Sequence, residues 1–279
     1  MKAGGLRWGR LGWMAVGTLI FGALLLGSLA APEFLSAPSR GASFKGPFEV
    51  LPFGTDGLGR PLLEYALQGA QIVTLPSILA AAVVSLLAVI AGMSRSVGWG
   101  WSETALQGFT ELVGALPRLV VVLVVALAVP RELRSLYPIA VTWAILAAPG
   151  AMDEAAATAE RLGGARFVEA LRAHGFSAFR IYVLHILWFN LRSVIVRQAA
   201  EVAMQVMFLE IALSYLAARR SEPSLTCLDS TNSWAKLLYD GYTALVGGVP
   251  ALHSLGLGLG LVALVAVMSQ AMRIAARPR

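Results

Sequence analysis

The sequence predicts an all-α, polytopic membrane protein with about six transmembrane helices. The chain is 57% hydrophobic and 14% charged, and its mean hydropathy is +0.72, whereas a soluble domain carries about a quarter charged residues. Its apolar residues gather in stretches close to 20 residues, the length that crosses about 30 Å of hydrocarbon. The 28 Gly and 13 Pro have no period, which excludes a collagen-like chain, and the apolar content excludes disorder.

Six apolar stretches are expected to cross the membrane. They are Leu11 to Ala31, Gln71 to Met93, Leu116 to Val129, Tyr137 to Met152, Phe189 to Ala218 and Val249 to Met272. The third is short, and it lengthens if the amphipathic stretch from Glu103 joins it. The first is longer than a secretory signal core of about 7 to 15 residues, so we expect it to be retained as an anchor.

The positive charges indicate orientation. The net charge is +6, but no run of five basic residues exists to follow a phosphate backbone, so nucleic acid is not an expected partner. Lys2, Arg7 and Arg10 precede the first stretch and predict a cytoplasmic N-terminus. Six crossings then return the C-terminus to the cytoplasm.

This topology divides the chain into three parts. Residues 1–36 form a cytoplasmic tail and the first helix, 37–69 an external segment, and 70–279 a five-helix core. Within the core, 153–188 is the main cytoplasmic loop and 219–248 a second external segment.

The sequence offers no residues for metal, cofactor or catalytic chemistry. Cys227 is alone, and the histidines His174, His185 and His253 form no ligand spacing. No Lys follows a Gly, so there is no phosphate-binding P-loop, and no HExxH or GxSxG motif occurs. We expect a protein that is not an enzyme, with any ATP hydrolysed in a separate subunit.

The cytoplasmic loop is predicted to form a helical elbow. Phe167, Ala170, Leu171 and His174 recur at helical spacing and make a narrow apolar stripe. Gly175 is expected to end this helix in a left-handed cap, and Ser177 to start the next. Such an elbow can dock into another protein's groove, or it can rest on lipid headgroups.

Charges within the fifth stretch need partners or water. Arg197 and Glu201 are four residues apart and are expected to pair along one helical face. The alternative is that Gln198, Glu201 and Glu210 line a translocation path.

Two segments carry recognisable motifs: residues 168–175, with Arg180 and His185, and residues 52–60, which read Pro-Phe-Gly-Thr-Asp-Gly-Leu-Gly-Arg. The first resembles the cytoplasmic EAA loop, and the second is similar to the PFGTDxLGR signature, of the second permease subunit in the dipeptide, oligopeptide and nickel importer family of ABC transporters. Pro149-Gly150 and then Ser233-Trp234 with Asp240-Gly241 follow the family order. The resemblance covers about residues 50–279.

The resemblance implies a type I importer permease in a bacterial cytoplasmic (inner) membrane. Its partners would be a homologous permease, two ABC ATPases, an external binding protein and a peptide-like substrate. The implied ATPase-coupling residues are Glu169, Ala170, Leu171, Arg172, His174, Gly175, Arg180 and His185. Those of the implied external gate are Gly54, Thr55, Asp56, Gly59 and Arg60.

Other interpretations stay open. The EAA-like loop departs from the family pattern, which leaves an accessory or scaffold subunit that does not transport, and the cargo could be a nickel chelate. A secondary carrier is disfavoured because no inverted repeat is evident. Asp56 and Arg60 are expected to staple their turn rather than touch substrate, Trp234 to anchor the membrane interface, and His185 to be a satisfied polar group at a helix join.

Overall fold

A computed structural model describes residues 3–39, 41–97, 100–130, 135–163, 166–177, 179–219, 233–249 and 251–276. Within these ranges every regular element is a helix. The helices are α1 Ala3–Leu29, α2 Leu62–Val97, α3 Gly100–Gly114, α4 Arg118–Ala128, α5 Leu136–Gly163, α6 Arg166–Ala173, the π-helix η2 Arg180–Leu191, α7 Arg192–Arg219, α8 Trp234–Val246 and α9 Leu252–Ala275. The predicted all-α class is therefore confirmed for the described residues.

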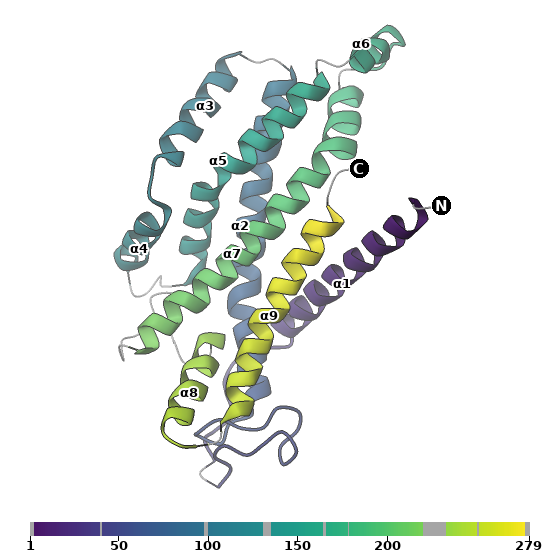
Figure 1. The fold of residues 1–279 in the computed structure, drawn as a ribbon. Coiled ribbons are helices and arrows are strands. Elements are labelled where there is room, and N and C mark those ends of the chain that lie inside the picture. Colours follow the sequence, from purple (N-terminus) through teal and green to yellow (C-terminus); the bar gives the residue numbers. More distant parts are fainter. Residues whose placement is uncertain are drawn as a thin grey trace.

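The long helices form an elongated bundle (Figure 1). α2 packs against α5 and α7, and α1 packs against α9. α6 lies at one end of the bundle, while α8 and the coil of residues 30–61 lie at the opposite end (Figure 1). The first residues of α1 and the last of α9 point toward the half that carries α6.

Small side chains allow the central helices to approach closely. One core cluster joins α2 and α5 through fully buried alanines, among them Ala80, Ala88, Ala140 and Ala144, and α7 adds larger side chains such as Val206. A second cluster joins α1, α2, α7, α8 and α9 around Trp234, Tyr65 and Met207. Close packing of small residues is how helices associate in lipid, where hydrophobic burial gives little advantage.

Among the described residues, four helical segments are long and apolar enough to cross a membrane, which indicates a multi-pass membrane protein. They are Leu11–Leu29, Leu62–Ser96, Leu136–Arg161 and Leu252–Ala275. The pair formed by α3 and α4 makes a fifth candidate if it counts as one span. α7 is not among them, so the predicted count of six is not confirmed.

The helix bounds correct two details of the sequence reading. The stretch from Glu103 is helical, as α3, but it meets α4 at 82° instead of continuing it. Pro117 precedes α4 with an extended backbone, because proline cannot continue a helix from the turn before it. α5 passes Asp153 and reaches Gly163, so the first part of the loop predicted for 153–188 is helix.

Candidate functional site

The segment that resembles the external signature forms a tight, closed turn. Gly54 and Gly59 have φ of 85° and 77°, a region that favours glycine. A Cβ on Gly54 would collide with the Lys45 carbonyl oxygen, and one on Gly59 with that of Ser39. Both glycines are therefore required by backbone conformation and by close approach.

Asp56 organises this turn from the inside. Its side chain is 4% exposed. Oδ1 accepts hydrogen bonds from the backbone N–H groups of Leu58 and Arg60, both at 2.8 Å, and Oδ2 accepts one from the Tyr65 hydroxyl at 2.7 Å. Asp56 thus staples the turn as expected, and its bond to Arg60 is to the backbone N–H group of that residue.

The turn is also tied to distant helices. Thr55 accepts a hydrogen bond from the Lys45 backbone at 3.0 Å, and its side chain donates to the Ala42 carbonyl. The Thr55 carbonyl lies 3.0 Å from Nε2 of His253 in α9. The five gate residues of the sequence analysis therefore lie together in one packed unit.

Trp234 was expected at the membrane interface, and this expectation is wrong. The side chain is fully buried, and its indole N–H donates to the Ala66 carbonyl at 3.0 Å. A Cβ on Gly69 would collide with the indole ring. Trp234 therefore joins α8 to α2 in the core, and the missing signal was Gly69, whose small size makes room for it.

The elbow at the opposite end has the predicted cap. Gly175 has φ of 80°. Its N–H donates to the Arg172 carbonyl at 2.9 Å, and that of Phe176 donates to the Leu171 carbonyl at 3.1 Å, the two bonds of a Schellman motif. Ser177 begins the next helix, since its carbonyl accepts from the Ile181 N–H at 3.1 Å.

α6 contacts the bundle through few side chains. Val168 is buried, and Arg172 donates to the Tyr182 hydroxyl at 2.5 Å. In the predicted apolar stripe, Ala170 and His174 are exposed, and Leu171 is partly buried. The Phe167 side chain lies outside the described part. Glu169 is exposed as well.

In η2, which follows the elbow, two aromatic rings lie near His185. Its ring lies 6.0 Å from the Phe176 ring and 6.1 Å from that of Phe189, and Nδ1 is 3.1 Å from the Arg180 carbonyl. The Arg180 guanidinium lies 4.8 Å from the centre of the Phe176 ring. This agrees with the expectation of a satisfied polar group at a helix join.

The charged residues of α7 pair differently from the prediction. Arg197 forms an ion pair with Glu154 of α5, not with Glu201. Gln198 donates to the other Glu154 oxygen at 2.7 Å, and Gln205 approaches Glu201 at 3.4 Å. The Arg197–Glu154 pair forms in place of the Arg197–Glu201 pair because it satisfies charged groups on two packed helices. With Gln198, it makes a polar strip between α5 and α7.

Glu210 does not belong to that strip. Its side chain is fully buried, Oε1 accepts from the Ser214 hydroxyl at 2.7 Å, and Oε2 has no hydrogen-bond partner. The three predicted path residues are therefore not brought together, since Gln198 and Glu201 are partly exposed and Glu210 lies inside the bundle.

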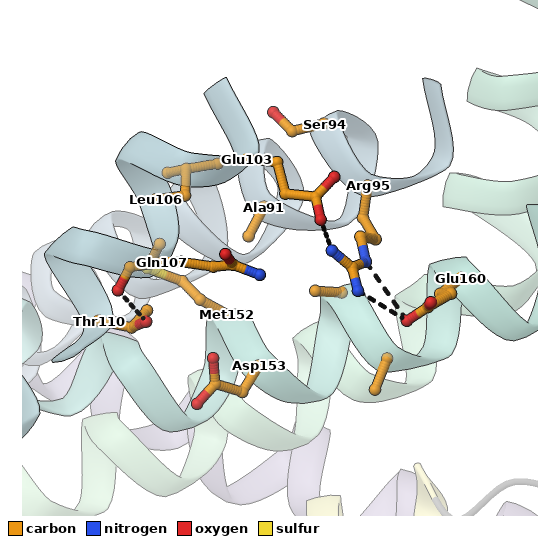
Figure 2. A pocket seen from close by; sticks show the side chains of 12 residues that line it. Ala91, Ser94, Arg95, Glu103, Leu106, Gln107, Thr110, Met152, Asp153 and Glu160 are labelled. Carbon is orange, nitrogen blue, oxygen red and sulfur yellow. Dashed lines mark hydrogen bonds and ion pairs between the residues drawn. The ribbon is translucent and has the colours of Figure 1, made fainter. Parts of the chain in front are cut away.

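Sequence reasoning missed an ion-pair cluster near the α6 end (Figure 2). Arg95 of α2 pairs with Glu103 of α3 and, at 3.2 Å, with Glu160 of α5. The cluster borders a cavity of about 210 Å³ whose wall also includes Asp153 and Gln107. The cluster has no local sequence signal, because its three charged residues come from separate helices.

No group of three or more metal-ligating side chains occurs in the described part of the chain, and Cys227 lies outside that part. No protein-family model matches the chain, and no curated protein matches its sequence. The class that fold and site define is thus a multi-pass helical membrane protein with a buried turn at one end of the bundle and an exposed helical elbow at the other.

Proposed function

We propose that this chain is a membrane-spanning permease subunit of an ATP-driven ABC importer for peptides or peptide-like solutes. Together with a homologous permease, it would enclose the translocation path. Two cytoplasmic ATPases would drive its conformational change by ATP hydrolysis, and an external binding protein would supply the solute. The motifs at residues 52–60, 168–175 and 233–241 support this proposal by their order.

One observation carries the proposal. The segment resembling the coupling loop is a short helix at the end of the bundle, with Glu169, Ala170 and His174 exposed and a rigid Schellman turn behind them. A helix presented in this way can enter a groove of another protein. The segment resembling the external signature lies at the other end, as an importer would require.

The polar strip between α5 and α7 supports a path along this face. Arg197 and Glu154 each keep 33% of the side chain exposed, and Gln198 and Glu201 are partly exposed. Polar groups inside a membrane protein are costly unless they are paired or face water. In the proposed importer, this strip faces the solute pathway and the second permease, whereas Glu210 supports the packing.

Purification from the native membrane in mild detergent tests the proposal. The chain is expected to emerge with an ATPase and a second permease. The double variant Glu169→Arg with Gly175→Pro should lose the ATPase but keep the second permease, because the elbow alone is altered. Glu49→Arg, an exposed carboxylate at the opposite end, is the matched control and should retain both.

Isolation of the intact chain without either partner would contradict the proposal. Co-purification without any solute uptake by the reconstituted complex would instead favour the accessory subunit. Uptake by Gln198→Ala, compared with Glu49→Arg, then tests the path, and unchanged uptake would return Gln198 to a structural role.

A further inference from the structure

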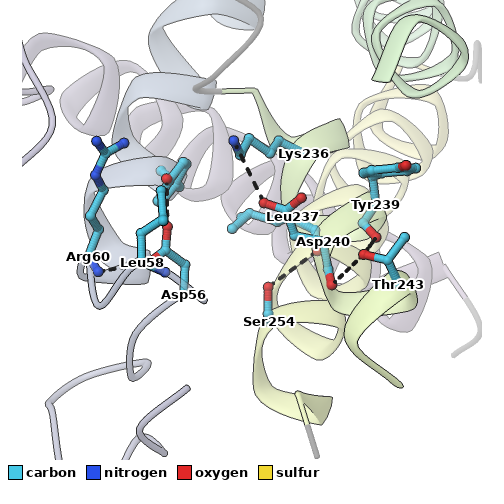
Figure 3. A network of polar contacts seen from close by, with 10 residues as sticks. Asp56, Leu58, Arg60, Lys236, Leu237, Tyr239, Asp240, Thr243 and Ser254 are labelled. Carbon is cyan, nitrogen blue, oxygen red and sulfur yellow. Dashed lines mark hydrogen bonds and ion pairs between the residues drawn. The ribbon is translucent and has the colours of Figure 1, made fainter. Parts of the chain in front are cut away.

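A second cavity lies between the stapled turn and α8, at the end of the bundle opposite α6 (Figure 1). Figure 3 shows Asp56 of the turn on one side and Lys236 and Asp240 of α8 on the other. It measures about 490 Å³, and its wall includes Phe44, Asp56, Lys236, Asp240 and Thr243. These residues come from the coil before α2 and from α8, which are about 180 residues apart in sequence. The cavity is large enough for a small organic molecule.

Carboxylates outnumber ammonium groups among the residues that line this wall. Asp56 and Asp240 supply two carboxylates, and Lys236 supplies one ammonium group. Lys236 Nζ stands 3.8 Å from Asp240 Oδ2, which is longer than a charge-assisted hydrogen bond of about 2.8 Å. Arg60 does not line the cavity. The Arg60 guanidinium acts on Tyr65, which donates to Asp56, so Asp56 has a cation nearby outside the cavity wall, whereas the near cation of Asp240 is Lys236.

The two carboxylates differ in what they can offer a ligand. Asp56 already accepts three hydrogen bonds from Leu58, Arg60 and Tyr65, so it contributes mainly its charge. Within the described part of the chain, the Asp240 side chain pairs loosely with Lys236, and 38% of it is exposed. Burial raises the pKa of Asp240, Lys236 lowers it, and the nearby charge of Asp56 raises it. A second cation would relieve the repulsion between the two aspartates.

The remaining wall also suits a cation. The Phe44 ring lies against Gly57, since a Cβ on that glycine would come within 2.8 Å of the ring. An aromatic face attracts a cation within about 6 Å. The Thr243 hydroxyl donates to the Tyr239 and Asp240 carbonyls, at 2.9 and 3.1 Å, so its oxygen can still accept. An ammonium group has three donors and no acceptor, which complements these surroundings.

We propose that this cavity binds the ammonium group of a small organic cation, with Asp240 as the principal contact, Phe44 as the aromatic wall and Lys236 as an internal competitor. The site goes beyond the proposed permease role, because it names a ligand class and a set of binding residues that this role does not require. Binding can be measured without ATP or transport.

Titration calorimetry with n-butylammonium chloride on the purified full chain in detergent at low salt tests this proposal. The wild type is expected to bind saturably, and neutral n-butanol is not. Asp240→Asn should weaken binding about tenfold or more, as expected for loss of a charged hydrogen-bond partner. Lys236→Met should strengthen binding several-fold, because it removes the competitor.

Phe44→Leu should weaken binding about threefold, and Asp153→Asn, a carboxylate near the other end of the bundle, should leave it unchanged. The decisive result is that Asp240→Asn weakens binding while Lys236→Met strengthens it. If the variants only damaged the ion pair, both would change the affinity in the same direction. Absence of saturable binding, equal binding of n-butanol, or weaker binding in Lys236→Met would each overturn the proposal. None of these results depends on whether the chain assembles with an ATPase.

Discussion

The two ends of the bundle hold their motifs in contrasting ways. At the α8 end, hydrogen bonds link residues far apart in sequence, such as Thr55 with His253 and Ala66 with Trp234. At the α6 end, the bond between Arg172 and Tyr182 spans only ten residues, and Ala170 and His174 of the α6 stripe are exposed. The first end is built to keep its shape, and the second to present a surface.

The largest expected difference comes from one matched pair of glycine substitutions. Gly54 and Gly175 have nearly equal φ, 85° and 80°, but a Cβ would meet the Lys45 carbonyl oxygen at Gly54 and nothing within 4 Å at Gly175. Gly54→Ala should cost more than about 3 kcal/mol, whereas Gly175→Ala should cost only about 1 to 2 kcal/mol of local strain. Thermal unfolding in detergent measures both.

If Gly54→Ala and Gly175→Ala lowered the melting temperature equally, the proposed contrast between the α8 end and the α6 end would be wrong. Gly12→Ala, within α1 and with nothing within 4 Å of an added Cβ, is the control for a harmless glycine substitution.

Removal of the buried staple should have the next largest effect. Asp56→Ala leaves two backbone N–H groups and the Tyr65 hydroxyl without their acceptor. Each unsatisfied buried donor costs at least about 1 kcal/mol, so a loss of about 3 kcal/mol is expected for the three donors. Tyr65→Phe, which removes only one donor, should cost about 1 kcal/mol. Thermal unfolding again gives the measure, and equal effects of the two changes would contradict the proposed staple.

A smaller, local effect is expected at the elbow. Tyr182→Phe removes the hydroxyl that accepts from Arg172. Hydrogen exchange should quicken in α6, with the melting temperature changed by little, because α6 opens apart from the bundle. Tyr137→Phe, at the start of α5, is the control. Faster exchange throughout α2 and α5 would show that α6 is a structural part of the bundle after all.

The smallest expected effect is a pH dependence at α8. Burial raises the pKa of Asp240 from 3.8, and the charge of Asp56 adds to the rise while Lys236 opposes it. Between 3.8 and the raised value, the folded protein binds the proton more strongly than the unfolded chain does, so stability falls as pH increases. Melting temperatures of Asp240→Asn should show a flatter pH profile across this window than those of wild type. An unchanged profile would exclude Asp240 as the source.

Composition and local pattern predicted the helices well where the helix depends only on residues that are close in sequence. The apolar stretches located α1, α2, α5 and α9, and Gly175 and Ser177 were correctly assigned as cap and start of the elbow. These features depend on residues that are neighbours in sequence.

Features that depend on neighbouring helices were not predictable in the same way. Arg197 has an acid four residues away, yet its partner is Glu154 on another helix. Trp234 is buried because Gly69 leaves space for it, and Arg95 gathers two acids from two helices. The π-helical winding of η2 also gave no recognisable sequence signal.

The bend of 82° between α3 and α4 has a consequence for the surrounding lipid. With 15 and 11 residues, the two arms rise only about 22 and 16 Å at about 1.5 Å per residue. Neither equals a hydrocarbon layer of about 30 Å, and arms that meet almost at a right angle do not add their lengths. If this pair is surrounded by lipid, we expect hydrophobic mismatch to be greatest beside the bend, where the bilayer would have to thin to match the short arms.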